Sequence, residues 1–553
     1  MCSNFGGRWG AALKAAGFDG LVLTGASEKP IFLLIDGNGI AFEDAADLWG
    51  KDTAQTGRLL KDRFSAAAAV AAIGPAGENR VAAATILADD DASGSGLGAV
   101  MGAKKVKAIT VVRTGKLIPE IHAPERVKAL TQHLRKLKPD GSAPYFKWMQ
   151  QALPAPERLK RQICYGCISG CNRTSYESPE GEKGKLLCTA GDFYKPLARS
   201  FYGNSNEVPF EAARLCNRYG IDIMFIQSVA RWLQQCHLQG LLTEAEIDLP
   251  LSRIGSGEFI EELLRQISFR QDFGQALAEG MAATAGAIGG KARELFTHGA
   301  YDKMDRPLTY SPRLYLPNAL LYALEFKKQT ALLHRIVYTL IPWKYWSDGL
   351  PDSPASSGLV QQIMKRYWDF DGDFTSYAGQ AQLAKAIQNR VYAQDNLILC
   401  DKTWSIVLTG NPDEPMISPD LEAELIQAVT GIKMDTAEFL RTGERVFNLQ
   451  RALYIREGHR GVAEDTLPDS VFNEPLETEH NNAECLVPGK DGRPVSRKGA
   501  TLDKPEFEEM RRDYYRISGW DPATGYPTAK ILKALELSEV AADLKHRGLI
   551  EDG

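Results

Sequence analysis

The stretch Val70-Ala-Ala-Ile-Gly-Pro-Ala-Gly-Glu-Asn79 sets the architecture that we expect for the first part of the chain. Its first five residues are typical of a buried strand, and the Pro and Gly that follow indicate a turn. We expect a second strand over 81–87, and a glycine-rich loop over 92–98 that leads to a strand over 108–112. Short strands between glycine-dense loops predict a mixed α/β layer for residues 1–113.

The residues on either side of this stretch follow two different patterns. Before it, we expect a helix over 8–17, strands over 21–24 and 31–35, a turn over 36–39 and a helix over 45–64. Beyond residue 120, long amphipathic segments bounded by Gly, Pro or Asp predict helices. They cover 124–138, 209–242, 257–289, 358–366, 380–393, 419–430 and 436–457, and residues 480–497 indicate a surface loop.

The length of 553 residues exceeds the size at which one hydrophobic core usually stops growing. We therefore expect an α+β protein: an α/β base domain over 1–113, a mostly helical domain over 114–315 and a C-terminal helical domain over 316–553. The 44% hydrophobic and 24% charged residues are ordinary for a soluble globular protein. A net charge of -5 gives no electrostatic reason to expect nucleic acid or an anionic membrane as a partner.

The nine cysteines are irregularly spaced, and the chain shows no signal-peptide pattern. This usage indicates metal chemistry in a reducing compartment rather than a disulfide framework, so we expect a cytoplasmic protein. No uninterrupted apolar run approaches the length that is needed to cross a bilayer.

Three of the cysteines are clustered in Cys164-Tyr-Gly-Cys167-Ile-Ser-Gly-Cys171. The C-x2-C-x3-C spacing lets three thiolates converge on one small inorganic core, and the intervening glycines let the backbone curl around it. Zinc would accept such ligands, but no second C-x2-C or H-x3-H pair follows. A cubane iron–sulfur cluster needs four thiolates that can lie far apart in sequence, and Cys400 is our candidate for the fourth. The alternative is a set of buried structural thiols.

The glycine-rich loop Gly94-Ser-Gly96-Leu-Gly98 is a weak phosphate-binding signal. It lacks the GKS/T triplet of a nucleotide P-loop, and it meets the dinucleotide fingerprint only in the G-x-G-x-x-A form. A plain turn is the alternative. Glycines also mark 6–7, 74–77 and 220. Together these sites favour a large phosphorylated cofactor that is held by several loops.

Longer segments carry a resemblance to a known family. Ile73-Gly-Pro-Ala-Gly-Glu-Asn79, followed by Gly98-Ala-Val-Met-Gly102-Ala-Lys-Lys-Val-Lys-Ala-Ile109, closely resembles the tungsten-dependent aldehyde ferredoxin oxidoreductase family. Gly6-Gly7 with the Leu13–Asp19 segment resembles it too, and the likeness runs from residue 4 to the C-terminus. Within the family, the chain is most similar to the active-site subunit of class II benzoyl-CoA reductase.

The resemblance implies one tungsten or molybdenum held by two pterin dithiolenes, a 4Fe-4S cluster beside it, and Mg²⁺ between the pterin phosphates. The implied cluster ligands are Cys164, Cys167, Cys171 and Cys400. The two pterin motifs match Asn217-Arg-Tyr-Gly220-Ile-Asp222 and Asp395-Asn-Leu-Ile-Leu399-Cys400. The implied cofactor-binding residues are Asn4, Gly6, Gly7, Ala92, Gly94, Gly96, Asn217, Gly220, Asp222, Asp395 and Leu399.

The chain departs from the family pattern at several positions. Asn217 replaces an Asp, and Ile398 replaces a Gly. Carboxylates at 89–91 stand where the family carries arginines, and they would repel a diphosphate unless a cation intervenes. The family begins with a β-rich segment before Gly6-Gly7, so the resemblance indicates either an N-terminally shortened base domain or a misassigned start codon.

One departure bears on the chemistry. Aldehyde-oxidising members carry a Glu in a Pro-Glu-Tyr-Glu type sequence, and this chain has Leu186-Leu-Cys188 there. In class II benzoyl-CoA reductase subunits the matching Cys ligates tungsten, and a thiolate suits a soft metal. The resemblance thus implies that Cys188 is a tungsten ligand; the alternative is a small buried hydrophobe.

The implied reaction is the reduction of an aromatic acyl-CoA to a cyclic dienoyl-CoA, with electrons from a ferredoxin or a ferredoxin-like iron–sulfur subunit of a larger complex. The candidate proton donors are Glu325 and His334; the alternatives are a solvated helix face and a satisfied core imidazole. Two other functions stay open. One is an aldehyde:ferredoxin oxidoreductase, and the other is a truncated, non-catalytic paralogue that binds the cluster without pterin.

Overall fold

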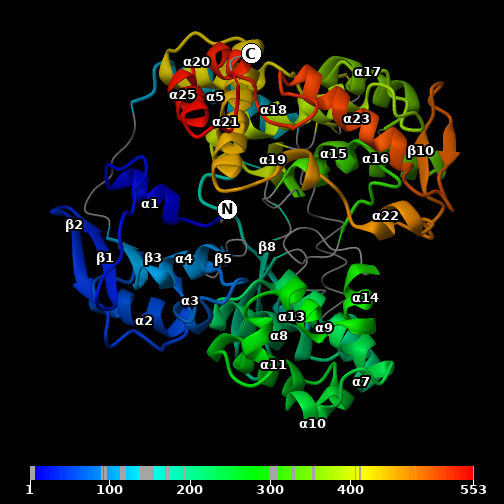
Figure 1. Cartoon of the computed structure of the whole chain (residues 1–553). Helices are drawn as coiled ribbons and strands as arrows, with labels where there is room; N and C mark the ends of the chain where they lie inside the picture. The colour runs from blue at the N-terminus through cyan, green and yellow to red at the C-terminus, as the bar shows by residue number, and fades with distance from the viewer. Residues whose placement is uncertain are drawn as a thin grey trace. The chain divides into compact units, whose positions relative to one another are not determined.

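The computed structural model describes residues 6–88, 91–92, 96–112, 120–137, 155–168, 171, 173–187, 190, 193–298, 308–325, 330–350, 355–404, 407–409, 411, 413–479 and 481–551. The chain divides into two compact units, which Figure 1 shows as ribbons. Unit 1 comprises Met1–Pro119 and Asp140–Pro307, and unit 2 comprises Glu120–Pro139 and Leu308–Gly553. The α+β fold class is confirmed, whereas the three-domain division stays a prediction.

Unit 1 contains a six-stranded mixed sheet with the strand order β2-β1-β6-β3-β4-β5. The strands are β1 (Ile31–Asp36), β2 (Gly39–Asp44), β3 (Ala69–Ile73), β4 (Ile86–Ala88), β5 (Asp91–Ala92) and β6 (Val106–Val111). β1 runs parallel to β6, and the other pairs are antiparallel. β3 is buried along its whole length, as its apolar sequence and its place inside the sheet require.

The segment after β3 differs from the expected strand, turn and strand. α3 (Pro75–Glu78), a single helical turn, stands where we expected a simple turn. The strand expected over 81–87 is reduced to β4. The reason is that residues 83–85 form backbone hydrogen bonds with residues 220–222 rather than with a neighbouring strand.

Two further expectations near the N-terminus are wrong. Residues 21–24 form no strand, and Val22 is 90% exposed; β2, which we did not expect, pairs with β1 instead. The helix expected over 45–64 is α2 (Thr53–Arg63), because Asp52 forms a capping box that begins the helix there. α1 (Trp9–Ala15) and α4 (Leu97–Ala103) complete this part of unit 1.

The rest of unit 1 is a small sheet and a set of helices. The sheet has the order β7-β8-β9, with β7 (Lys160–Arg161), β8 (Arg173–Glu177) and β9 (Lys183–Leu187). The helical elements are η1 (Pro156–Arg158), α7 (Lys195–Tyr202), α8 (Val208–Tyr219), α9 (Ile223–Leu238), α10 (Glu244–Ile247), η3 (Leu251–Arg253), α11 (Gly257–Phe269), α12 (Gly274–Leu277), α13 (Met281–Ile288) and α14 (Gly290–His298).

Two of the expected long helices in unit 1 are interrupted. The segment 209–242 is split at Gly220, which has φ 73°. The segment 257–289 is split after α11, where Arg270 adopts φ 53°. A residue in the left-handed conformation commonly ends a helix, and periodicity alone does not detect such a residue.

Unit 2 is mostly helical. Its helical elements are α5 (Pro124–Leu137), α15 (Pro317–Leu324), α16 (Thr330–Ser347), α17 (Ser357–Trp368), α18 (Gln380–Asn396), α19 (Asp401–Trp404), α20 (Leu421–Thr430), α21 (Thr436–Arg456), η4 (Gly461–Ala463), α22 (Asp469–Asn473), α23 (Lys504–Ile517), α24 (Ala529–Ala534) and α25 (Ser538–His546). The loop expected over 480–497 contains a hairpin, β10 (Leu486–Pro488) and β11 (Pro494–Ser496).

The main core of unit 2 surrounds α18, which packs against α15, α16, α21 and α23. Its face carries Leu383, Ala384, Ile387 and Val391 at helical spacing, and all four are buried. Within the described residues, no helix is long and apolar enough to span a membrane.

Candidate functional site

The three clustered cysteines lie on a short loop of unit 1 between β7 and β8. Cys164, Cys167 and Cys171 are half-buried thiols. Gly166 has φ 72°, and the Cys167 N–H donates to the Cys164 carbonyl over 3.1 Å, so the loop turns sharply between the first two thiols. In the described part of the chain, no three Cys, His, Asp or Glu side chains converge closely enough to hold a metal ion. Their convergence on one cluster therefore stays a prediction.

The glycine at position 6 lies directly against this loop. A Cβ atom added to Gly6 would stand 3.0 Å from Cys164 Sγ and 2.5 Å from Arg173 Nη1, so a side chain there would displace the Arg173 guanidinium and press on the Cys164 thiol. Arg173 is buried at the start of β8. The contact joins a predicted cofactor residue to a predicted cluster ligand, and sequence analysis did not single out Arg173.

The hairpin of β8 and β9 fixes the register of the chain beyond the cysteine loop. Arg173 pairs with Leu187. Arg173 is two positions after Cys171 in the sequence, and Leu187 is the position before Cys188. Cys188 itself lies outside the described residues, as do Asn4 and Gly94, and the side chain of Ala92 is not described.

A second group of predicted residues meets at the corner between α8 and α9. The Asp222 N–H donates to Ala83 O over 3.0 Å, and the Thr85 N–H donates to Gly220 O over 2.8 Å. The Gly96 N–H donates to Ala84 O over 2.8 Å. Residues 83–85 therefore bring Gly96, Gly220 and Asp222 together, although more than 120 positions separate Gly96 from Gly220 in the sequence.

The glycines of the two family-like segments have a packing role in this arrangement. A Cβ on Gly98 would lie 2.5 Å from Thr85 O, and one on Gly220 would lie 2.9 Å from Gly74 N. A Cβ on Gly102 would overlap the Gly77 carbonyl, where α3 and α4 cross. These glycines permit close approach of backbone to backbone. Their contact with a phosphate stays a prediction.

Asn217 contributes to the same corner through its backbone. Its carbonyl accepts from Thr53 Oγ1 over 2.9 Å. The Asp222 side chain accepts from the Met224 N–H over 2.8 Å and caps α9. The carboxylate of Asp222 is 9% exposed, so it stands at the buried N-terminus of a long helix, where a negative charge is favoured.

The second pterin-like motif lies in unit 2, at the end of α18. Ile398 has φ 55°, which is unusual for a β-branched residue, and its side chain is 82% exposed. The Leu399 N–H donates to Gln394 O over 3.1 Å. Cys400 is exposed and directly precedes α19, whose first residue is Asp401. The motif therefore keeps a left-handed backbone turn, a conformation that glycine favours, although isoleucine occupies this position.

Glu325 is buried at the end of α15 rather than on a solvated helix face. It is 0% exposed, and its two carboxylate oxygens accept from Gln388 Nε2 over 2.7 Å and from the Tyr392 hydroxyl over 2.9 Å. Burial, together with the Glu325 charge, raises the pKa of Tyr392 well above its usual value. The Tyr514 hydroxyl donates to Gln388 and extends this buried polar network.

His334 is buried on α16 and is held on both sides. Its Nδ1 lies 2.6 Å from Asp401 Oδ2, and its Nε2 lies 3.3 Å from the Tyr338 hydroxyl, whose ring stacks on the imidazole. Asp401 also lies 3.7 Å from Arg335. Sequence analysis missed Asp401 and Arg335, although each directly follows a residue that it did identify, Cys400 and His334.

Three other cysteines, Cys216, Cys236 and Cys485, are buried among apolar side chains. Burial raises the pKa of each of these thiols, that of Cys236 to about 11. A thiol that resists deprotonation is a poor metal ligand, and this favours a structural role for these three cysteines.

Comparisons with known proteins define the class. The model of "Aldehyde ferredoxin oxidoreductase, N-terminal domain" matches residues 1–113, and that of "Aldehyde ferredoxin oxidoreductase, domains 2 & 3" matches residues 143–537. The chain belongs to the aldehyde ferredoxin oxidoreductase family and is an oxidoreductase.

Relatives cover nearly the whole chain. The "Tungsten-containing aldehyde ferredoxin oxidoreductase" of Pyrococcus furiosus is 25% identical over 96% of this chain and 84% of its own length. The protein of the same name from Thermococcus kodakarensis is 24% identical over 96% of this chain and 83% of its own length. The "Aliphatic sulfonate oxidoreductase, WOR-like subunit" of P. furiosus is 25% identical over 97% of this chain and 83% of its own length.

The fold is also found in a solved structure. It is similar to the "Active site complex BamBC of Benzoyl Coenzyme A reductase in complex with 1,5 Dienoyl-CoA", with a TM-score of 0.70 and 21% identity. The match covers 100% of this chain and 86% of the other.

Proposed function

We propose that this oxidoreductase carries a 4Fe-4S cluster ligated by Cys164, Cys167, Cys171 and Cys400. The donor set suits such a cluster, since four thiolates are its usual ligands and the fourth can come from a distant segment. The turn at Gly166 and the close approach of Gly6 to Cys164 Sγ keep the chain compact around the first thiol. Cys164, Cys167 and Cys171 belong to unit 1, and Cys400 belongs to unit 2.

The second cofactor in this proposal is a tungsten or molybdenum bis-pterin. Tungsten is in the names of two relatives. The corner that gathers Gly96, Gly220 and Asp222 would hold one pterin, and Asp395 with Leu399 would hold the other. Mg²⁺ would bridge the pterin phosphates at Asn4. Both motifs present a helix end in a left-handed turn, where backbone groups without an intrahelical partner can bind a polar cofactor.

We propose that the reaction is the reduction of an aromatic acyl-CoA by two electrons and two protons to a cyclic dienoyl-CoA. The observation that supports this choice of reaction is the pairing register of strands β8 and β9. It pairs the neighbour of Cys188 with the residue two positions after Cys171. The sequence neighbours of a predicted cluster ligand and of the predicted tungsten ligand are therefore strand partners. When bound, the metal centre supplies electrons of low potential.

The proton chemistry is assigned to His334 and Glu325. Asp401 fixes the imidazole through Nδ1, which leaves Nε2 as the atom that exchanges a proton, with the Tyr338 hydroxyl beside it. Glu325 would receive protons through the Tyr392 hydroxyl, while the Gln388 amide holds its carboxylate in place. The buried position of both groups excludes water from the proton path.

The partners follow from the same proposal. A ferredoxin or a ferredoxin-like iron–sulfur subunit would deliver electrons through the cluster, within a larger complex in the cytoplasm. The similar benzoyl-CoA reductase structure is a complex of more than one named component. Aldehyde oxidation is the second candidate, and the names of the curated relatives favour it. The non-catalytic alternative would bind iron without tungsten or molybdenum.

The test compares two reactions in protein purified without oxygen. One assay follows the oxidation of a cyclic dienoyl-CoA to the aromatic acyl-CoA with a viologen acceptor, and the other follows the oxidation of simple aldehydes. We expect turnover of the dienoyl-CoA, a loss of at least about 100-fold in Cys188→Ala, and little change in Cys216→Ala, a matched change at a buried thiol. Aldehyde turnover without dienoyl-CoA turnover would overturn the proposed substrate and establish the second candidate.

A further inference from the structure

Unit 2 contains a small cavity that the proposed reaction does not use. Its free volume is about 20 Å³, and about 10–15 Å³ on this measure is enough for one water molecule. Side chains from five helices, α16, α17, α18, α19 and α20, meet there. The lining residues are Arg335, Tyr367, Trp368, Arg390, Gln394, Trp404, Val407, Ile417, Ser418 and Glu422.

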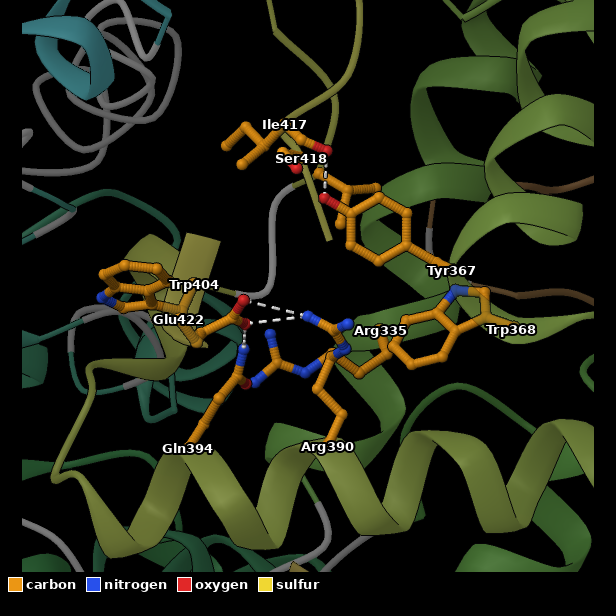
Figure 2. Close-up of a pocket in the computed structure, with 10 residues that line it drawn as sticks. Arg335, Tyr367, Trp368, Arg390, Gln394, Trp404, Ile417, Ser418 and Glu422 are labelled. Carbon is orange, nitrogen blue, oxygen red and sulfur yellow. Dashed lines mark hydrogen bonds and ion pairs between the residues drawn. The ribbon is translucent and has the colours of Figure 1, made fainter. Parts of the chain in front are cut away.

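Two buried guanidinium groups are the main feature of this cavity. Arg335 and Arg390 are each 3% exposed. Figure 2 shows their guanidinium groups next to each other, with Glu422 and Gln394 on one side and Trp368 on the other. Two positive charges in one small cavity are costly unless each finds a counter-charge or a set of hydrogen-bond acceptors.

The surroundings of Arg390 supply a counter-charge and hydrogen-bond acceptors for its guanidinium group. Its Nη1 donates to the two carboxylate oxygens of Glu422 over 2.9 and 3.0 Å, and its Nη2 donates to Pro419 O over 3.0 Å. Its guanidinium also lies 5.1 Å from the centre of the Tyr367 ring, a cation–π distance. The carboxylate of Glu422 is thus hydrogen-bonded to Arg390 and Gln394, and it acts on Arg335 through its charge alone.

The guanidinium group of Arg335 has fewer such contacts. The carboxylate oxygen Asp401 Oδ1 lies 3.7 Å from its Nη2, which is too long for a hydrogen bond. Asp401 is shared, since its Oδ2 lies 2.6 Å from His334 Nδ1. Within the described residues, Nε and Nη1 of Arg335 have no hydrogen-bond partner although they are buried. Burial lowers the pKa of Arg335, which reflects the cost of keeping this charge out of water.

Unsatisfied donors outnumber unsatisfied acceptors around the cavity. Arg390 Nε and Trp368 Nε1 are buried without a partner in the described structure, in addition to the two nitrogens of Arg335. Among the lining residues that the structure describes, Gln394 Oε1 is the unsatisfied buried acceptor. A ligand that completes this set must accept several hydrogen bonds, and it must be small. Water accepts two, whereas a carboxylate accepts about four.

We propose that this cavity binds a small carboxylate-type oxyanion, such as formate or acetate, with Arg335 as its main contact. Charge-assisted hydrogen bonds from guanidinium to carboxylate are among the stronger polar contacts in proteins. The small volume favours an acid of few atoms over aromatic and branched acids. The site does not depend on the proposed reaction, and it lies beside α19, the helix that directly follows Cys400.

The first test measures the melting temperature of the full-length, anaerobically purified protein in increasing formate at constant ionic strength, balanced with a bulky sulfonate. A ligand that binds the folded state raises the melting temperature in a saturable way, here by about 1–3 °C between 1 and 100 mM. Arg335→Met should fold, because an apolar side chain of similar volume often replaces a buried charge without loss of stability. It should lose the formate response.

Arg366→Met is the matched control, since Arg366 is exposed on α17, and it should keep the full response. A wild-type protein whose melting temperature does not respond to formate would overturn the proposal, and so would an equal response in Arg335→Met. Calorimetric titration of the wild-type protein adds a test without any substitution. Formate and acetate should bind, and benzoate should not. If benzoate binds with equal strength, the carboxylates bind at a site other than this cavity, and the proposal is overturned.

Discussion

Two helix corners, one in each unit, share a backbone conformation and differ in their surroundings. In unit 1, Gly220 adopts φ 73° after α8, and Asp222 caps the next helix. In unit 2, Ile398 adopts φ 55° after α18, and Cys400 precedes the next helix. In both corners the N–H after the left-handed residue donates to the carbonyl five positions earlier, over 3.0 and 3.1 Å, a common helix ending.

The difference lies in what surrounds the left-handed residue. A Cβ on Gly220 would lie 2.9 Å from Gly74 N, so the position has no room for a side chain. Ile398 instead extends its side chain into solvent, with 82% of it exposed. The left-handed turn alone therefore does not require glycine; a close backbone neighbour does. This explains why the second motif can have isoleucine at position 398 and still adopt the left-handed turn.

The largest effect that we expect at these corners is on the metal centre. Cys400→Ala should remove a cluster ligand, so an intact cluster with about four irons per chain should be lost or reduced to about three. Asp222 is at the equivalent position of the other corner and is not a predicted iron ligand. Asp222→Ala should therefore keep the full iron content. Iron analysis and electron paramagnetic resonance after anaerobic purification measure both. Full iron in Cys400→Ala would exclude Cys400 as a ligand.

The next effect is on stability. Gly220→Ala should destabilise unit 1 by about 3 kcal/mol, since backbone strain and the clash with Gly74 add. Gly203→Ala is the matched control: Gly203 ends α7 at φ 73° with no atom near its Cβ position, so strain alone should cost about 1 kcal/mol. Urea unfolding followed by circular dichroism measures both. Equal losses would show that conformation, and not the close neighbour, selects glycine.

A smaller effect is expected at the cap of α9. Asp222→Ala should destabilise unit 1 by about 1 kcal/mol, because the Met224 N–H loses its acceptor. Asp222→Asn should cost only a few tenths of that value, because the amide oxygen can still accept. The same urea titration measures the two changes. An Asn variant as unstable as the Ala variant would mean that the charge, rather than the cap, matters.

The smallest effect concerns Ile398. Ile398→Gly should stabilise unit 2 by about 0.5–1 kcal/mol, because relief of the left-handed strain exceeds the entropy that glycine costs in the unfolded chain. Leu397→Gly, one position earlier in an ordinary helical conformation, should destabilise instead. The urea midpoints of the two variants should therefore move in opposite directions from that of the wild-type protein, and a shift in the same direction would contradict the strain.

Local sequence patterns were enough to predict β1, β3 and β6, and the unit 2 helices α5, α17, α18, α20 and α21. They failed where a long-range contact replaced a local one. Residues 83–85 were expected to continue a strand, yet they bond to residues 220–222, and no local pattern carries that information. Periodicity also missed the breaks at Gly220 and Arg270, because helical spacing of apolar residues continues across a left-handed residue.

The candidate site shows the same division. The cysteines and glycine motifs were visible in the sequence because their spacing is specific. The roles of Asp401, Arg335 and Arg173 were not, since each acts through a contact that only the folded chain makes. Glu325 was identified as a residue, but its burial and its partners Gln388 and Tyr392 could not be anticipated from its position in the sequence.

The most direct test of the central claim, that the chain carries one 4Fe-4S cluster and one bis-pterin metal, is elemental analysis of protein purified without oxygen. We predict about four iron atoms and close to one tungsten or molybdenum per chain, with Gly220→Ala losing the heavy metal before the iron. Iron at that level with neither tungsten nor molybdenum in the wild-type protein would contradict the account.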